Sequence, residues 1–370
     1  MGLLYAKNQG VCMGVFFVLL LFPMMVQHIA IKGHYIDYQK RNRAALAFFF
    51  FLLTVLVMLR HESVGTDTDN YCYYFKKFSN TSWTGLGKYN LEDGFSYFAK
   101  FLSLLSIDPQ FFLAVSAIVV TVLIYPTYKR LCVDTSLTIV LFCIMSTFVM
   151  MFSGIRQMMA VGIGFVAYEF TRNKKLVPFV IAVGIATTFH ASGFMLVFMY
   201  PLYHARITKK WLLVVIPALT AVFVFNRQIF SVLGIFLERY TKYDASIVQT
   251  GAYTMVILFA AFAVFSFLIP DEARLDDEVI GLRNFLLLAL VIQMFAPLNT
   301  VAVRMNYYYI IFIPLLLPKI IELRSKRWNQ VAMMGRHIMV AFFFVYFFMN
   351  AYGGGNLKVF PYHFFWENVG

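Results

Sequence analysis

The residues of this chain that could do chemistry are concentrated in one polar stretch, residues 60–95, RHESVGTDTDNYCYYFKKFSNTSWTGLGKYNLEDGF. It supplies carboxylates, hydroxyls and amphipathic aromatic rings, which are the groups that proteins use to hold a sugar. A solvated loop with Asx-type turns would contain many of the same residues. The placement of the other polar residues has to decide between these interpretations. The candidates within the stretch are Thr66, Asp67, Asp69, Tyr71 and Glu92.

Three arginines and one histidine stand at the ends of apolar runs. Arg60 follows AALAFFFFLLTVLVML, Arg156 opens IRQMMAVGIG, and Arg304 lies in NTVAVRMNYYY. Arginine is always charged and binds phosphate through a planar pair of donors, so these residues predict a bound phosphate or pyrophosphate headgroup, with Gln157 in support. Arginines that only anchor helix ends are the alternative. His190, in TTFHASGF, could act as a general base or bind phosphate, because its pKa lies near neutrality.

The composition identifies the elements that must position these residues as membrane helices. Hydrophobic residues make up 61% of the chain and charged residues 13%, and the mean hydropathy is +0.73. We therefore predict an all-α polytopic membrane protein with a single transmembrane domain, residues 1–370. A net charge of +13 would also suit nucleic acid, but cytoplasmic Lys and Arg account for it in a membrane protein, so no nucleic-acid partner is expected. No cleavable signal peptide is expected either.

The apolar runs predict about twelve transmembrane helices. A further amphipathic piece, 94–106, is too short to span and is expected to lie in the interface or to re-enter the membrane. The polar stretch and this piece form a predicted extracytoplasmic loop over 60–107, and a second such loop is expected over 226–253. The predicted helices are 11–31, 44–59, 109–128, 136–152, 154–170, 176–189, 193–204, 211–225, 254–270, 285–302, 307–322 and 338–350.

The loops between these helices differ in their density of Lys and Arg. The denser set is expected on the cytoplasmic side, which places the polar stretch, both termini, Arg156, His190 and Arg304 together on the outer side. The weakest point is the hairpin at 189–193, because merging its two helices would reverse everything downstream. The denser loops are 32–43, 129–134, 171–175, 205–210, 271–283 and 323–337.

No metal or cofactor is expected. Asp67-Thr68-Asp69 resembles the metal-binding motif of some sugar-nucleotide transferases, but those enzymes work in the cytoplasm and this segment is predicted to lie outside. The chain has no P-loop, HExxH, GxSxG or dinucleotide-binding motif. Its cysteines show neither metal-ligand nor disulfide spacing; they are Cys12, Cys72, Cys132 and Cys143.

Four motifs in chain order resemble those of one family. They are Arg60 with VGTD and a following Tyr, then Glu92-Asp93-Gly94-Phe95, then SGIRQ, then FHASG. Together they resemble the EpsG family of Wzy-like polysaccharide polymerases. The likeness runs from Arg60 to about Gly193, and after residue 205 only Arg304 stands out.

The resemblance implies a GT-C-like glycosyltransferase in the bacterial cytoplasmic membrane with its active site on the outer side. Such an enzyme polymerises undecaprenyl-pyrophosphate-linked oligosaccharide repeat units into O-antigen, capsule or exopolysaccharide. Its partners would be the lipid-linked donor and acceptor and membrane lipids, with a flippase and a chain-length regulator as further candidates. Arg156 and Arg304, with Arg60, would hold the donor pyrophosphate, and the base would be His190 or one of Asp67, Asp69 and Glu92.

Two other functions fit the same residues. A lipid-linked glycan ligase would use a similar site, and sequence separates it from a polymerase only through the family motifs. A lipid-linked oligosaccharide flippase or transporter would instead show internal repeats and charged residues near the membrane midplane, neither of which stands out in this chain.

Overall fold

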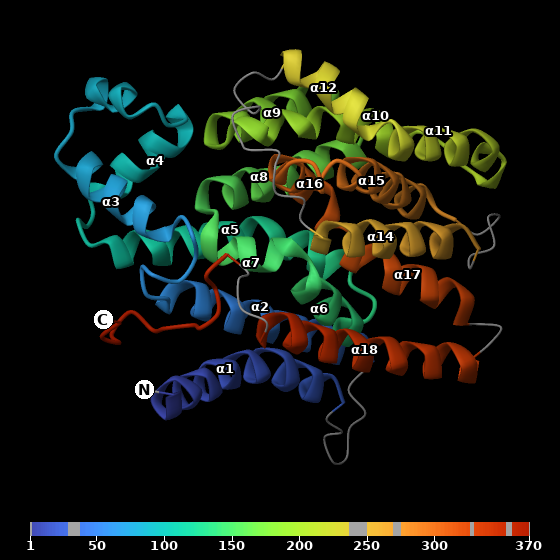
Figure 1. Ribbon diagram of the computed structural model, residues 1–370, viewed down its shortest axis with the longest axis horizontal. Coiled ribbons are helices and arrows are strands. Elements are labelled where there is room, and N and C mark those ends of the chain that lie inside the picture. Colours follow the sequence, from blue (N-terminus) through green and yellow to red (C-terminus); the bar gives the residue numbers. More distant parts are fainter. Residues whose placement is uncertain are drawn as a thin grey trace.

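The structure is a computed structural model, and it describes residues 2–28, 38–236, 250–268, 275–325, 329–352 and 357–369. Those residues form helices joined by short connections and include no strand (Figure 1). The first half of the fold consists of α1 (Gly2–His28), α2 (Tyr38–Leu59), α3 (Thr68–Ser79), η1 (Trp83–Tyr89), α4 (Asp93–Ser103), α5 (Pro109–Leu131), α6 (Thr135–Ile144), α7 (Ser146–Ser153), α8 (Ile155–Arg172) and α9 (Leu176–Phe189).

The second half begins with 3-10 helix. It consists of η2 (Ala191–Phe198), α10 (Met199–His204), η3 (Lys209–Trp211), α11 (Leu212–Val224), α12 (Asn226–Phe236), α14 (Thr250–Leu268), α15 (Asp277–Gln293), α16 (Thr300–Ile310), α17 (Ile313–Ser325) and α18 (Asn329–Tyr352). A 3-10 helix rises about 2 Å per residue against about 1.5 Å in an α-helix, so η2 and α10 together reach about 25 Å with only fourteen residues.

Apolar helices confirm a helical membrane protein. Three described segments are long and apolar enough to cross a bilayer, and three bent helix pairs would raise this number to six if each pair is one span. Twelve separate spans and a GT-C-like architecture are not confirmed. The three unbroken segments are Gln39–Leu59, Pro109–Leu131 and Met334–Ala351.

Several predicted boundaries are wrong. The predicted helix 136–152 is divided at Met145, whose extended backbone separates α6 from α7 with a bend of 67°. The predicted helices 285–302 and 307–322 have a different division. α15 ends at Gln293, and α16 already includes Arg304, because the side chain of Asn299 caps α16 by accepting a hydrogen bond from the Val301 amide at 2.8 Å.

Helices also occupy two segments that were predicted as loops. α3, η1 and α4 fold most of the 60–107 segment, and α4 confirms the predicted short amphipathic helix. α3 was missed, although Tyr71, Phe75 and Phe78 recur at helical spacing and are buried on one face. The second predicted loop, 226–253, begins with α12 and ends inside α14; its residues 237–249 lie outside the described part of the chain.

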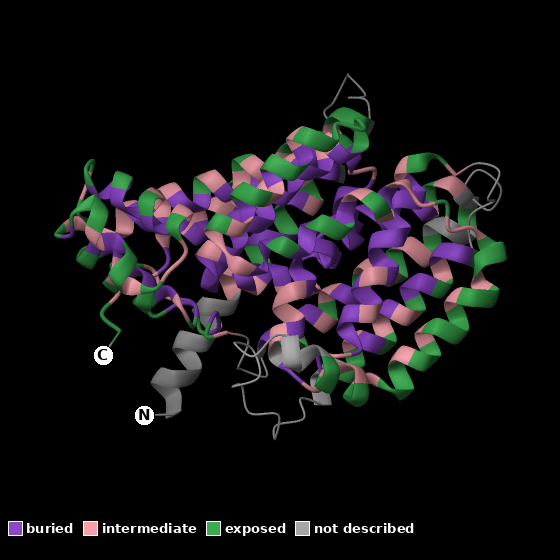
Figure 2. Ribbon diagram, turned by 90° about the horizontal axis from the view of Figure 1, so that it is seen from above, coloured by how far each residue is buried: buried purple, intermediate pink, exposed green. Residues whose placement is uncertain are grey.

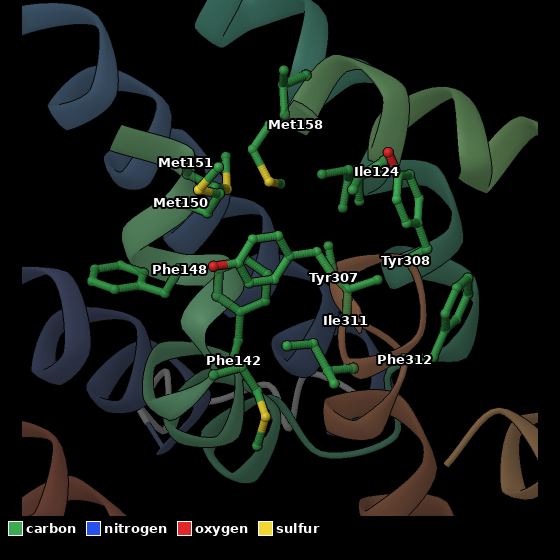
Figure 3. Packing of buried hydrophobic residues seen from close by; sticks show 14 of the residues in the cluster. Ile124, Phe142, Phe148, Met150, Met151, Met158, Tyr307, Tyr308, Ile311 and Phe312 are labelled. Atoms are coloured by element: carbon green, nitrogen blue, oxygen red, sulfur yellow. The ribbon is translucent and has the colours of Figure 1, made fainter. Parts of the chain in front are cut away.

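The buried core is rich in aromatic and methionine side chains. Figure 2 shows buried residues through the middle of the bundle and exposed residues along its outermost helices. At the centre, Phe142 of α6 and Phe148 of α7 belong to one buried cluster with Met158 of α8 and Tyr307 of α16 (Figure 3). α8 packs against α5, α7, α9, α10, η2 and α16, so this one helix reaches most of the fold.

The connections gather at two opposite ends of the bundle. α3, α4 and the C-terminal segment share one end, at the left of Figure 1. The other end joins the predicted cytoplasmic loops to one another: Asp134 pairs with Arg336, and Arg206 pairs with Asp277 at 2.9 Å. For the four loops that these two ion pairs join, the arrangement agrees with the predicted sorting by charge. Which end faces the cytoplasm stays a prediction.

Candidate functional site

The polar end of the bundle holds a group of five side chains that we call the arginine cluster: Asp67, Glu92, Arg156, His190 and Arg304. They come from five different elements or connections. α8 begins at Ile155, directly after Gly154, so Arg156 stands in its first turn as predicted. Gly164 on the same helix lies against the side chain of Leu196 in η2, and its lack of a side chain allows this close approach.

Arg156 is held by a carboxylate and by two aromatic rings. Its guanidinium forms an ion pair with Glu92, and its Nε donates to the hydroxyl of Tyr71 at 3.5 Å. The guanidinium also lies 5.7 Å from the ring centre of Tyr71 and 5.9 Å from that of Phe95. These contacts fix the planar group while 23% of the side chain remains exposed. Arg156 is therefore both oriented and accessible, as an anion-binding residue needs to be.

Glu92 joins the polar stretch to the α9–η2 hairpin. Its second carboxylate oxygen accepts a hydrogen bond from the Ala191 amide at 3.1 Å. Gly94 makes this approach possible, because a Cβ at that position would lie 2.3 Å from the Thr188 hydroxyl. Burial raises the pKa of Glu92, but the charge of Arg156 and the Ala191 amide outweigh it and lower the pKa overall. Glu92 is thus an ionised carboxylate with both oxygens engaged.

His190 occupies the hairpin tip, as predicted, and its protonation is determined by its neighbours. Its Nδ1 accepts a hydrogen bond from the Ser192 amide at 3.2 Å and lies 2.7 Å from the Ser192 hydroxyl. Because an amide can only donate, the proton of the neutral ring must be on Nε2. Burial lowers the pKa of His190 to about 4, with the positive charges of Arg156 and Arg304 acting in the same direction and Glu92 opposing them. His190 therefore presents a neutral N–H donor.

Asp67 is positioned by a turn that only glycine allows. Gly65 has a φ of +95°, and a Cβ on it would lie 2.3 Å from the carbonyl oxygen of Phe152. Two hydrogen bonds hold the turn against the end of α7, from the Asp67 amide to the Ser153 hydroxyl at 3.3 Å and from the Thr68 hydroxyl to the Phe152 carbonyl at 3.0 Å. The Asp67 carboxylate then lies 4.0 Å from Arg304.

Gln157 connects the two arginines. Its Nε2 donates to the backbone carbonyl of Arg304 at 2.5 Å and to the Ser192 hydroxyl at 3.4 Å, and its side chain is buried. The Ser192 hydroxyl is in turn 3.0 Å from that of Tyr308 in the core. α8, the hairpin and α16 are thereby held in one arrangement around the cluster. Ser192 and Tyr308 were not predicted, since neither stands out from its apolar surroundings in the sequence.

The remaining predicted residues divide between the site and its surroundings. Tyr71 is buried beside Arg156, whereas Thr66 and Asp69 are exposed, and one oxygen of Asp69 accepts a hydrogen bond from the following amide. Arg60 does not join the cluster. It is 1% exposed, donates to the carbonyl of Val57 and lines a small cavity under the site.

The C-terminal segment is a second feature that sequence reasoning missed. The Gly65 amide donates to the Lys358 carbonyl at 3.0 Å, and the His61 amide donates to the His363 carbonyl at 2.8 Å. Tyr362 is buried, and its hydroxyl donates to the carbonyl of Leu56 at 2.7 Å. The C-terminal segment therefore packs against the turn that carries Asp67, which lies about 300 residues away in sequence. The run of apolar and aromatic residues in KVFPYHFFW is the one local signal for such packing.

Metal ligation is not supported in the part of the chain that the structure describes, where no three His, Cys, Asp or Glu side chains are grouped as an ion would require. The expected absence of a metal nevertheless stays a prediction. The described cysteines Cys72, Cys132 and Cys143 are free.

The fold and the site together define a class of protein. It is a helical membrane protein that has a cluster of arginines, carboxylates and a neutral histidine at one end. Comparison with family models narrows this class. The EpsG family model matches residues 43–364, most of the chain, and the protein belongs to the EpsG family. No curated protein and no solved structure matches it.

Proposed function

We propose that the protein is a glycosyltransferase that polymerises lipid-linked oligosaccharide repeat units on the outer face of the bacterial cytoplasmic membrane. Family membership supports polysaccharide synthesis. The observation that carries the proposal is one cluster that holds Arg156, Arg304, a neutral imidazole N–H and a partly exposed carboxylate, with Gln157 bonded to the backbone of Arg304. This combination suits the departure of a pyrophosphate from an anomeric carbon. The donor and the acceptor would both be undecaprenyl-pyrophosphate-linked glycans.

The leaving group would be stabilised by the two guanidinium groups and by Nε2–H of His190. As the bond from the anomeric carbon to the pyrophosphate oxygen breaks, negative charge develops on that oxygen, and fixed donors stabilise it without reorganisation. Arg156 is held by Glu92 and Tyr71 and keeps 23% of its side chain exposed, so it could donate to a phosphate without first being ordered. Its carboxylate partner Glu92 would keep it in place between turnovers.

The base would be Asp67. We prefer Asp67 to His190, because Nδ1 of His190 accepts a hydrogen bond and its pKa is lowered, and to Glu92, because both of its oxygens are engaged. Asp67 has 28% of its side chain exposed, and its nearest cation is Arg304 at 4.0 Å. The acceptor hydroxyl would lose its proton to Asp67 while its oxygen bonds to the anomeric carbon. Such a direct displacement inverts the anomeric configuration, which NMR of the product can determine.

The test compares two neighbouring aspartates in purified protein reconstituted with a lipid-linked repeat unit. Asp67→Asn should abolish the ladder of polymer lengths, whereas Asp69→Asn should leave it intact, because Asp69 is exposed and engaged with its own turn. Equal ladders from both variants would overturn the assignment of the base. A single transfer to a different acceptor, without a ladder, would identify a ligase, and movement of substrate without bond formation would identify a flippase.

Polymerisation is also expected to survive EDTA, because the proposed charge stabilisation comes from guanidinium groups. The control is a metal-dependent glycosyltransferase assayed in the same buffer. Full inhibition that Mg²⁺ or Mn²⁺ restores would return Asp67 and Asp69 to the role of metal ligands.

A further inference from the structure

A second polar site lies at the opposite end of α8 from the arginine cluster. A cavity of about 340 Å³ opens there between the α8–α9 connection, α10 and the start of α15. Its polar lining includes Lys174, His204, Arg206 and Asp277, and its walls include the rings of Tyr200 and Tyr203. None of these residues takes part in the proposed transfer reaction.

The charges around the cavity favour an anion. Lys174 and Arg206 contribute two positive charges, and Asp277 contributes one negative charge. Arg206 and Asp277 form an ion pair at 2.9 Å, but their side chains are 75% and 68% exposed, so this pair is weak and leaves Arg206 available. The nearby carboxylate Glu278 does not add to the negative charge, because it is engaged by Arg130 at 2.6 Å and by Lys319 at 2.9 Å.

The surroundings of the cavity suit a lipid rather than a free anion. α9 starts directly beside it and presents an exposed apolar stripe at helical spacing: Val177, Val180, Ile181 and Ile185, which are 69%, 57%, 57% and 47% exposed. On the other side, the loop after α10 leads through Lys209 and Lys210 to Trp211, which is 54% exposed. Basic residues followed by an exposed tryptophan are typical of the boundary between water and lipid.

We propose that this cavity binds the phosphate of an anionic membrane phospholipid, with Lys174 and Arg206 on the phosphate and the acyl chains along the exposed stripe of α9. Basic pockets between membrane helices bind anionic headgroups in this way. The site is independent of the proposed transferase activity, because it is built from the far end of α8 and from residues that do not contact the arginine cluster.

The backbone conformation at Lys174 allows a substitution that removes the charge without disturbing the turn. Lys174 follows the C-cap residue of α8 and has a left-handed backbone, with a φ of +57°, where asparagine and glycine are favoured over other residues. Its amide donates to Thr171, and the amide of Lys175 donates to Phe170, so the turn does not depend on the side chain. Lys174→Asn should therefore remove the charge and retain the fold.

The experiment measures phosphatidylglycerol and phosphatidylcholine binding to the full-length protein, by native mass spectrometry after detergent exchange. Wild-type protein should prefer phosphatidylglycerol. Lys174→Asn and Arg206→Gln should each weaken phosphatidylglycerol binding about five-fold, the value expected for loss of one cation near a membrane surface. Asp277→Asn should strengthen it by a similar factor, and phosphatidylcholine binding should not change. Lys88→Gln, an exposed lysine at the opposite end of the bundle, is the matched control.

Three results would overturn the proposal. They are equal retention of the two lipids by wild-type protein, unchanged phosphatidylglycerol binding in both cation variants, and displacement of the lipid by millimolar inorganic phosphate. The last result would assign the cavity to a free anion. Because Asp277→Asn is expected to change binding in the opposite direction from Arg206→Gln, a general loss of folding cannot imitate the predicted pattern.

Discussion

The two ends of α8 carry the same kinds of charged residue in different arrangements. At the far end, Glu278 accepts from Arg130 at 2.6 Å, Lys319 at 2.9 Å and the Tyr168 hydroxyl at 3.1 Å, and Arg130 also reaches Glu169 at 2.7 Å. This network satisfies its charges internally and ties α5, α8, α15 and α17 together. At the arginine cluster, Arg304 has 43% of its side chain exposed and its nearest carboxylate at 4.0 Å.

The comparison distinguishes charged residues that hold helices together from charged residues that can still bind a ligand. An ion pair that is closed by several short contacts holds helices together, and its carboxylates have no capacity left for a ligand. A guanidinium that is oriented by rings and by one carboxylate, yet still reaches water, retains that capacity. α8 is about 27 Å long, so it keeps the two arrangements electrostatically separate.

The largest expected difference between the two ends is in catalysis. Arg156→Lys keeps the charge but loses the planar fork, so we expect activity to fall by about 10²–10³-fold. Arg172→Lys, at the other end of the same helix, should retain activity because Arg172 makes only long contacts of 3.5 and 3.6 Å within the network. The measurement is the initial rate of ladder formation with both variants at equal amounts in membranes. Similar losses in the two variants would show that α8 as a whole, and not the cluster, determines the rate.

The second expected difference is in stability. Glu278→Gln leaves Arg130 and Lys319 without their shared carboxylate in a site where the Glu278 side chain is only 17% exposed. We expect a loss of about 3 kcal/mol in the free energy of unfolding, at the low end of the range for broken buried pairs. Glu92→Gln should cost less, because 22% of Glu92 is exposed and its pair with Arg156 is single. Thermal unfolding in detergent measures both, and equal losses would contradict the distinction between network and cluster.

A smaller effect is expected when the turn that presents Asp67 is disturbed. Gly65→Ala forces a Cβ against the Phe152 carbonyl and an unfavourable positive φ, at a cost of about 1–3 kcal/mol. The rate of ladder formation should fall even when the variant is fully folded, because the turn carries Asp67. Gly87→Ala is the control, since a Cβ there meets nothing within 4 Å. If Gly65→Ala retains the wild-type rate, Asp67 is not held in a reactive position by this turn.

A pH dependence of stability is also expected from the cluster. The folded pKa of His190 is about 4, below the ordinary value of 6.5, so the unfolded chain binds more protons between these values. The free energy of unfolding should therefore decrease as the pH falls from about 6.5 towards 4. His190→Asn can keep the hydrogen bond to the Ser192 amide through its side-chain oxygen and should show a flatter dependence. Melting temperatures of both proteins from pH 7 to pH 4 provide the test, and parallel curves would contradict the pKa of His190.

Arg60 illustrates where sequence reasoning reached its limit at the site. Its position after an apolar run correctly predicted the end of α2, but the same position was compatible with water, with a ligand or with the interior. The structure buries it, and burial lowers its pKa to about 10. The C-terminal segment pairs with the chain at Arg60, and nothing in the sequence around Arg60 indicates that contact.

The sequence by itself determined the properties that depend on neighbouring residues. Hydropathy identified a helical membrane protein, and loop charges predicted which connections share an end of the bundle. Arg156 and His190 were correctly placed at the start of a helix and at a hairpin tip. These features follow from local composition, because the bilayer selects apolar runs and excludes charge from them.

Only the tertiary structure decided which of those residues meet. The pair of Arg156 with Glu92 joins residues 64 apart, the bond from Gln157 to Arg304 spans 147, and the Tyr362 contact spans 306. The Ser192 amide that donates to Nδ1 of His190 fixes the tautomer of its neutral ring, and no pattern in the sequence indicated that contact. Such pairings depend on how helices pack and where backbones can approach one another. Gly65 and Gly94 allow those approaches, but their partners Phe152 and Thr188 are set by the fold and not by the adjoining sequence.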